Sequence, residues 1–250
     1  MKKTLIPTVI GIVIALVFSG LAITKFVPLE RLELLLYDVR YQIHGKDGSP
    51  QETVIVGIDD KSIEKVGRWP WDRSRIASIV DALKNMGAKV IVMDIVFSEP
   101  WKDDDALSAS IKKAGNVILP MVFDFKGEKG KISQDILYDS SFPIVRNTGN
   151  FKIFPPISAD RVLLPLQKFS TAAKALGHIN MFPDKDGVLR WEVMAIEFDG
   201  EIFPSISLQA ARVAQGLPME AMTLKAAEGI QLENSFIPTD FHGRTLIRYY

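Results

Sequence analysis

The chain has 250 residues, in which 30 lysines and arginines balance 30 aspartates and glutamates, and it contains no cysteine. The missing cysteine excludes disulfide bonds and thiolate chemistry, and a balanced charge without a basic face argues against nucleic acid binding. The first 27 residues hold three lysines and no acid, so the remainder carries 27 basic against 30 acidic residues, a net charge of −3. That remainder is long enough for one sizeable domain or two small ones.

The first predicted element is a membrane-spanning helix. Residues 5–27 read LIPTVIGIVIALVFSGLAITKFV, with no charge before Lys25. About 20 apolar residues are enough to cross a bilayer as a helix. Lys2 and Lys3 precede the run, so the positive-inside rule puts the N-terminus in the cytoplasm and residues 28–250 outside it. We therefore predict a transmembrane anchor over residues 1–27.

A cleaved signal peptide is the alternative for this segment. A basic start, an apolar run and small residues at Gly20 and Ala22 permit cleavage after Ala22. The apolar run continues through Phe26 and Val27, however, and cleavage would leave that apolar end exposed. The length of the run favours an uncleaved span, and both alternatives export the rest of the chain.

A stalk helix is expected next, over residues 28–45. Its apolar residues follow a heptad-like spacing: Leu29, Leu32, Leu36, Val39 and Ile43. The pattern lasts only two heptads, fewer than a coiled coil usually needs. It fits a helix packed on its own domain or, alternatively, a homodimer contact that carries a signal to the membrane.

The segments that follow alternate between strand and helix patterns. A turn-rich break at residues 45–50 leads to an apolar, β-branched run and then to helices and further apolar runs. We predict strands at 53–58, 90–97 and 116–123, and helices ending at Val66 and spanning 73–86 and 104–113. This order is typical of an α/β core with parallel strands.

The second half of the chain predicts smaller elements. Residues 124–150 are polar and irregular, Asp199-Gly200 marks a hairpin between 188–198 and 201–203, and residues 205–215 have a helical pattern. Further short strands are expected at 230–232, 236–237 and 245–250. The expected fold is therefore α/β, with a mixed, largely parallel sheet and flanking helices in one domain over residues 46–250, preceded by the transmembrane helix.

Aspartates at strand ends are the first candidates for a site. Asp59 and Asp94 fall at or near the carboxyl ends of predicted parallel strands, where open α/β sheets place ligands. Together with Asp103 to Asp105 they suggest an exported metal-dependent enzyme as one hypothesis. The alternative is that Asp59 and Asp60 cap the following helix. No phosphate-binding glycine loop accompanies these carboxylates, so no catalytic residue is assigned.

The string Gly67-Arg68-Trp69-Pro70-Trp71-Asp72-Arg73 is the most distinctive in the chain. Its tryptophans and arginines suit cation–π contact with a ligand, but a packed corner is the favoured interpretation, with Asp72 capping the next helix. If a ligand binds, we expect the ends of the predicted strands and the turn that contains the two tryptophans to form one pocket. Its predicted residues are Asp59, Asp60, Arg68, Trp69, Trp71, Asp94 and Phe97.

No metal or cofactor is predicted from the remaining residues. His44, His178 and His242 are scattered without a zinc-binding spacing, and residues 184–187 fit a tight turn better than a calcium loop.

Several strings resemble the CHASE2 sensory domain of bacteria. The similarity starts with residues 54–100, which contain GRWPW, and continues through the DDAL string at 104–107 and GNVIL at 115–119. It reappears in GHIN at 177–180, in Asp184 with DGVLR at 186–190, and from Ile237 to Tyr249. The resemblance covers nearly everything after the anchor, with residues 126–170 the least typical part.

The resemblance implies an extracytoplasmic signal-sensing module in the bacterial inner membrane. In the family, such a module precedes further membrane helices and a cytoplasmic output domain, often a class III adenylate or guanylate cyclase and otherwise a protein kinase. The expected partners are the lipid bilayer and an unidentified small-molecule or envelope ligand. An envelope-interaction domain without a small ligand is a further hypothesis. Because residues 245–250 end as a strand in progress, we expect the sensory domain to continue beyond this sequence.

Overall fold

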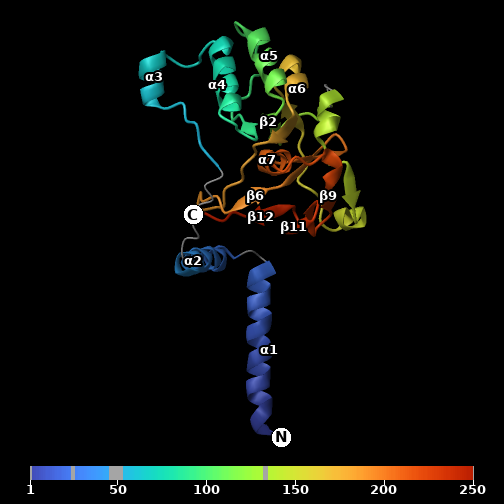
Figure 1. Ribbon diagram of the computed structural model, residues 1–250. Helices are drawn as coiled ribbons and strands as arrows, with labels where there is room; N and C mark the ends of the chain where they lie inside the picture. The colour runs from blue at the N-terminus through green and yellow to red at the C-terminus, as the bar shows by residue number, and fades with distance from the viewer. Residues whose placement is uncertain (1, 24–25, 45–52, 132–134, 250) are drawn as a thin grey trace. The chain divides into compact units, whose positions relative to one another are not determined.

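The computed structural model describes residues 2–23, 26–44, 53–131 and 135–249 (Figure 1). It contains two compact units, one formed by residues 1–56 with 248–250 and the other by residues 57–247. The turn-rich break predicted at 45–50 lies outside the described residues.

The first unit contains two helices. They are α1 (Lys2–Ile23) and α2 (Val27–His44), and α2 confirms the helix predicted after Pro28. Apolar side chains lie on every side of α1, and those from Val9 to Phe18 are at least half exposed. Within the described part of the chain, no helix combines the length and the apolar character that crossing a membrane requires. The structure therefore gives no support to the predicted span.

The second unit is built on a parallel sheet. Its strands are β1 (Ile91–Val92), β2 (Val117–Asp124), β4 (Arg161–Leu163) and β5 (Ala175–His178). β2 pairs with β1 and β5 in parallel, and its last residues pair with β4 in antiparallel orientation. β2 is buried along nearly its whole length, as a central strand covered on both faces should be. The predicted α/β core is thus confirmed.

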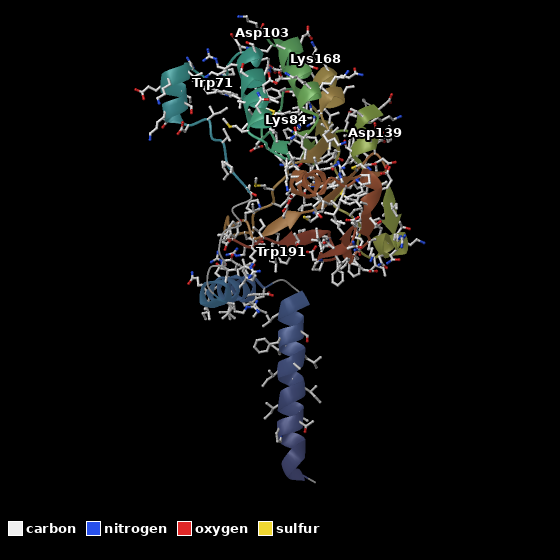
Figure 2. The ribbon with its side chains drawn as sticks, in the orientation of Figure 1. Trp71, Lys84, Asp103, Asp139, Lys168 and Trp191 are labelled. Carbon is white, nitrogen blue, oxygen red and sulfur yellow. The ribbon has the colours of Figure 1, made fainter. Side chains whose placement is uncertain are left out.

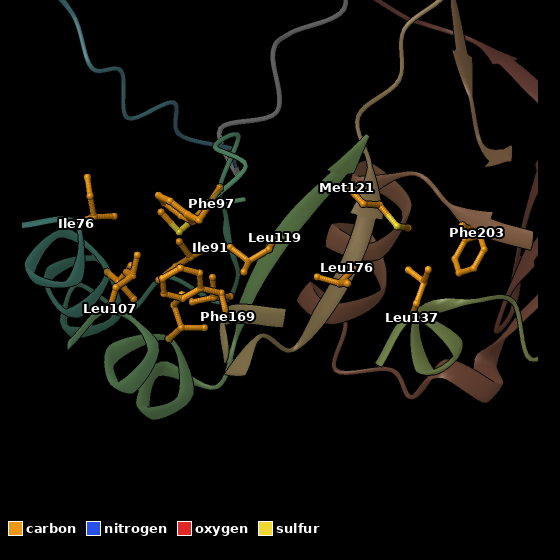
Figure 3. Close-up of a cluster of buried hydrophobic side chains, with 14 of the residues drawn as sticks. Ile76, Ile91, Phe97, Leu107, Leu119, Met121, Leu137, Phe169, Leu176 and Phe203 are labelled. Carbon is orange, nitrogen blue, oxygen red and sulfur yellow. The ribbon is translucent and has the colours of Figure 1, made fainter. Parts of the chain in front are cut away.

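Three helices cover one face of this sheet: α4 (Arg73–Asn85), α5 (Asp104–Ala114) and α6 (Gln167–Ala172). Ile76 of α4 and Leu107 of α5 bury their side chains beside Ile91 and Leu119 of the sheet (Figure 3). This apolar burial is what fixes the three helices on the sheet.

The opposite face carries α7 (Ile206–Ala214), which contacts β2 and β5. Its approach requires the glycine at position 177, because a Cβ there would lie 2.5 Å from Cα of Ile206. Ser205 begins α7 as its N-cap, with its hydroxyl accepting from the Leu208 N–H.

The remaining strands form smaller sheets. One sheet has the order β11-β10-β9-β3. Its strands are β3 (Ile144–Arg146), β9 (Met222–Lys225), β10 (Gly229–Leu232) and β11 (Ser235–Pro238). The other two are the pairs β6 (Trp191–Val193) with β12 (Arg244–Leu246) and β7 (Ala195–Phe198) with β8 (Glu201–Pro204). Short helical turns complete the unit: α3 (Asp60–Val66), η1 (Asp135–Ser140), η2 (Thr148–Lys152) and η3 (Met219–Ala221).

Three predictions about the strands differ from the structure. The sheet is largely parallel only around β2, because the short connections of the second half produce antiparallel hairpins. The strand predicted at 53–58 is absent: these residues are described, but they pair with no strand and are exposed. The strand predicted at 90–97 is reduced to Ile91–Val92, which leaves β1 very short.

A buried arginine closes the turn after β5. Arg190 donates to Asp184 at 3.0 Å and to Asp186 at 2.8 Å, and its own side chain is almost completely buried. The hydrogen bonds from Arg190 lower the pKa of Asp186 to about 2. The turn predicted at 184–187 is therefore held by the ion pairs of Arg190 with Asp184 and Asp186.

Replacing this arginine should destabilise the protein strongly. Arg190→Met removes the cation and leaves Asp184 largely buried without its partner, so we expect the free energy of unfolding to fall by roughly 3 kcal/mol. Urea denaturation measures the loss. Lys89→Met, at an exposed position, serves as the control and should change stability by less than about 0.5 kcal/mol. If the two substitutions lowered the free energy of unfolding equally, the ion pairs of Arg190 would not have the stabilising role described here.

His178 is a second buried polar residue, and neither of its ring nitrogens has a hydrogen-bond partner among the described residues. The ring lies edge-on to Phe123 with centroids 6.1 Å apart. Burial lowers the pKa of His178 to about 3, from an ordinary value of 6.5. In the folded protein the ring is therefore neutral at physiological pH.

This burial predicts acid lability. Below pH 6.5 the unfolded chain binds a proton at His178, whereas the folded chain does not bind it until the pH approaches 3. The free energy of unfolding should therefore be highest above pH 6.5 and should fall as the pH is lowered toward 3. The loss between pH 7 and pH 5 should be about 2 kcal/mol, since one pKa unit corresponds to about 1.4 kcal/mol. Urea denaturation at both pH values tests this, with His178→Leu as the comparison. If the variant loses as much stability as the parent between the two pH values, His178 is not the cause.

Candidate functional site

A groove of about 750 Å³ lies between α5 and α6. Asp104, Ser108 and Lys112 recur every fourth residue on α5, so one polar face of that helix forms one wall. The other lining residues are Pro100, Leu166, Gln167, Lys168, Thr171 and Ala172. The volume falls within the range of small-molecule sites, about 300–1,000 Å³.

One ion pair and one hydrogen bond connect the two walls of the groove near Lys168 of α6. Figure 2 labels this residue, together with Asp103 on the turn before α5. Lys168 pairs with Asp105 at 2.6 Å, and Ser108 donates to the Lys168 backbone carbonyl at 3.0 Å. The Asp105 hydrogen bond raises the pKa of Lys168. These contacts join the two walls directly.

Asp104 forms the floor at this end and is itself buried. Its Oδ1 accepts from Nε of Arg73 at 3.2 Å, and its Oδ2 accepts from the Trp101 N–H at 3.0 Å. Both oxygens are thus satisfied by groups of the protein. Because Asp104 lies in the first turn of α5, it also interacts favourably with the helix dipole.

Arg73 connects this floor to the core below it. The guanidinium carbon lies 4.5 Å from the centre of the Phe97 ring, in cation–π contact. The carbonyl of Phe97 accepts from the Leu166 N–H at 2.8 Å, which fixes the start of α6. The groove therefore rests on a packed layer that links α4, the segment after β1, α5 and α6.

The groove has a surplus of positive charge. Asp104 and Asp105 are each paired with a cation, whereas Lys112 makes no ion pair within the described part of the chain. Lys112 is exposed and lines the open part of the groove. The arrangement favours a small ligand that carries a negative charge.

The two aspartates that follow the first predicted strand have another role. Asp59 caps α3, with Oδ1 accepting from the Ser62 N–H at 2.9 Å and from the Ser62 hydroxyl at 2.6 Å, so the capping alternative is confirmed. These hydrogen bonds lower the pKa of Asp59. Asp60 is the exposed first residue of the same helix.

The aromatic turn is a packed corner, as favoured from the sequence. Trp69 and Trp71 meet edge-to-face with ring centroids 5.6 Å apart, and Nε1 of Trp71 donates to the Gly67 carbonyl at 2.7 Å. Arg68 is exposed. The cap predicted for Asp72 is wrong, because its carboxylate lies 3.5 Å from Nζ of Lys102 and makes no cap hydrogen bond with α4.

Phe97 and Asp94 complete the predicted set. Phe97 is buried in the same hydrophobic cluster as Trp71, whereas Asp94 is exposed. Neither residue lines the groove. Phe97 is connected to it indirectly, because its ring contacts Arg73 and Arg73 pairs with Asp104 of the groove. The structure thus brings the aromatic members of the predicted site together as a core.

The carboxylates of the enzyme hypothesis bind different partners. Asp103 accepts from the Ser74 hydroxyl at 2.7 Å, while Asp104 and Asp105 pair with Arg73 and Lys168. Over the described ranges, no three histidine, aspartate or glutamate side chains are grouped so as to hold a metal ion.

Comparison with protein families matches the chain to the CHASE2 domain over residues 9–250. The chain belongs to the CHASE2 family. CHASE2 domains are extracellular sensory domains, so the chain is a sensory module. No curated protein and no solved structure matches it.

The strings that carry the CHASE2 resemblance have structural roles in this chain. GRWPW forms the corner beside Arg73, and DGVLR contains the arginine that closes the turn after β5. DDAL supplies the acidic first turn of α5 and so reaches the groove through Asp104.

Sequence reasoning missed the groove for a specific reason. The spacing of Asp104, Ser108 and Lys112 is visible in the sequence, but the opposite wall is α6, a helix of six residues that was not predicted. A single polar helix face is usually a solvated surface, so only the position of α6 identifies it as a groove wall.

Proposed function

We propose that this CHASE2 chain is the ligand-sensing module of a bacterial transmembrane receptor, and that its ligand binds in the groove between α5 and α6. The groove carries this proposal, because its volume suits a small molecule and its walls come from two helices. The buried positions of Trp71 and Phe97, which are 7% and 1% exposed, favour the groove over the pocket expected from the sequence.

The ligand we propose is a small anion with further polar groups. Lys112 offers a cation that has no ion-pair partner among the described residues, and Gln167 and Thr171 offer hydrogen-bonding groups at the opposite wall. Leu166 and Ala172 supply apolar surface for the rest of the ligand. Charge-assisted hydrogen bonds to Lys112 would dominate the affinity.

A thermal-shift screen of small carboxylates, phosphates and sulfates tests the site. A ligand at 100 times its dissociation constant should stabilise the folded protein by about 2.7 kcal/mol and raise its Tm accordingly. Lys112→Ala should weaken binding of that ligand roughly 10-fold or more, because a hydrogen bond to a charged group contributes about 1.5–3 kcal/mol. The neighbouring Lys113→Ala, also on α5 but outside the groove, is the matched control.

A shift that survives unchanged in Lys112→Ala would place the ligand elsewhere. In that case the family assignment would stand, and the groove would be abandoned as the site.

We further propose that residues 1–27 anchor the module in the inner membrane, with the N-terminus in the cytoplasm and residues 28–250 outside. The support comes from the uncharged run that begins at Leu5 and from Lys2 and Lys3 in front of it. The exposure of the apolar side chains along α1 adds to it, since water is a poor solvent for such a helix.

Reporter fusions test this orientation. An alkaline phosphatase fused after Tyr250, which is active only outside the cytoplasm, should be active, and a fluorescent or β-galactosidase reporter at the same place should not be. The reverse pattern would exclude the proposed orientation.

The relay to a cytoplasmic output domain is part of the same proposal. The stalk helix α2 exposes Leu32, Leu36, Val39 and Ile43, the apolar residues of its heptad-like spacing. A second copy packed on this face would form a homodimer whose arrangement responds to the ligand. Such a response requires that the ligand bind the two arrangements with different affinity.

A further inference from the structure

The two lysines that line the groove meet α5 at different points along its length. Lys168 of α6 reaches the first turn of α5, where its Nζ lies 2.6 Å from Oδ1 of Asp105. Lys112 belongs to the last turn of α5, two helical turns after Asp105. Since an α-helix rises about 1.5 Å per residue, the two positions are about 10 Å apart along the helix axis. The groove therefore offers two cations that are separated along its length.

The ion pair between Lys168 and Asp105 can be exchanged for another at little cost. The Asp105 side chain is 94% exposed, so its carboxylate stays hydrated when the lysine leaves it. An exposed ion pair of this kind contributes little to stability. The flexible four-carbon chain of Lys168 lets its ammonium group turn into the groove, which this residue already lines.

The other groups of the groove favour a ligand that is charged at both ends. The charge of Asp104 is balanced by Arg73, and its second oxygen accepts from the Trp101 N–H. Leu166 and Ala172 add apolar surface to the wall that carries Lys168. Two anionic groups joined by an apolar chain match this arrangement, whereas a compact anion such as sulfate leaves the apolar wall without a partner.

We propose that the groove binds a short-chain dicarboxylate, with one carboxylate on Lys112 and the other taking the place of Asp105 on Lys168. This inference rests on the proposed function, because it names the ligand class of the same groove. It adds that binding exchanges one ion pair of the protein for one with the ligand.

The exchange changes how the two walls are joined. In the unliganded protein, Lys168 connects α6 directly to α5 through Asp105, and the Ser108 hydroxyl donates to the Lys168 carbonyl. With the ligand bound, the hydrogen bond from Ser108 remains, while the charged contact runs through the ligand to Lys112. The spacing of α5 and α6 then depends on the length of the ligand, which gives the module a signal to transmit.

Isothermal titration calorimetry on the full chain in detergent micelles, at low and constant ionic strength, tests the two-cation site. The probes are succinate, glutarate and adipate, each compared with the monocarboxylate of the same chain length. At least one dicarboxylate should bind about 10-fold more tightly than its matched monocarboxylate, because it makes a second hydrogen bond to a charged group. Lys168→Gln should remove this advantage and leave the affinity for the monocarboxylate unchanged.

Removing the competing carboxylate should strengthen binding. Asp105→Asn frees Lys168, so the affinity for the dicarboxylate should rise about 2- to 5-fold, in keeping with the small contribution of an exposed ion pair. Glu64→Gln, at an exposed position of α3 outside the groove, changes the net charge by the same amount and is the matched control. It should leave the affinity unchanged.

The results separate this inference from the proposed function. If dicarboxylates and monocarboxylates bind equally and Lys112→Ala weakens both, the two-cation site is overturned and the groove remains the ligand site. If Asp105→Asn leaves the affinity for the dicarboxylate unchanged or lowers it, the exchange on Lys168 is overturned. If none of the three dicarboxylates binds, the ligand class is wrong, and the thermal-shift screen with Lys112→Ala still decides the proposed function.

Discussion

The buried guanidinium of Arg73 is the contact on which the groove depends. It stacks on the Phe97 ring on one side and pairs with Asp104 on another, so it joins α4, the segment after β1 and α5 at one point. Burying a charge is costly unless it is both paired and hydrogen-bonded. Arg73 meets this requirement, since its carboxylate partner is also bound by the Trp101 N–H. The cost of separating the pair keeps these elements in one arrangement.

The position of the groove follows from this arrangement. Asp104 is held by Arg73, which fixes the first turn of α5, and the Phe97 carbonyl fixes the start of α6. The two walls are then connected near the solvent by Lys168 with Asp105, an exposed pair of the kind that contributes little stability. A groove with a rigid floor and weakly joined walls suits a sensor, because a ligand can change the spacing of the walls without disrupting the core.

A second set of buried polar contacts lies on the side of β5 that faces away from β2. The Ser140 hydroxyl accepts from the Leu176 N–H, and the Gln209 amide donates to the Leu176 carbonyl. Side chains thus satisfy backbone groups that a neighbouring strand would otherwise satisfy. The contrast with β1 is informative. The β5 edge is closed by polar side chains, whereas the groups of Val92 on β1 have no such partners among the described residues.

The sequence by itself determined the α/β core, the helices α2 to α5 and α7, the corner at the two tryptophans, and the family. These features depend on local patterns: apolar periodicity, glycine and proline positions, and a distinctive string. Only the tertiary structure decided which charged residues meet. Arg73 with Asp104 and Lys168 with Asp105 are 31 and 63 residues apart in the chain, and no spacing rule connects them. The same holds for the strand predicted at 53–58, whose composition is right for a strand. Strand formation requires a partner edge as well as a propensity, and the partner is a property of the fold.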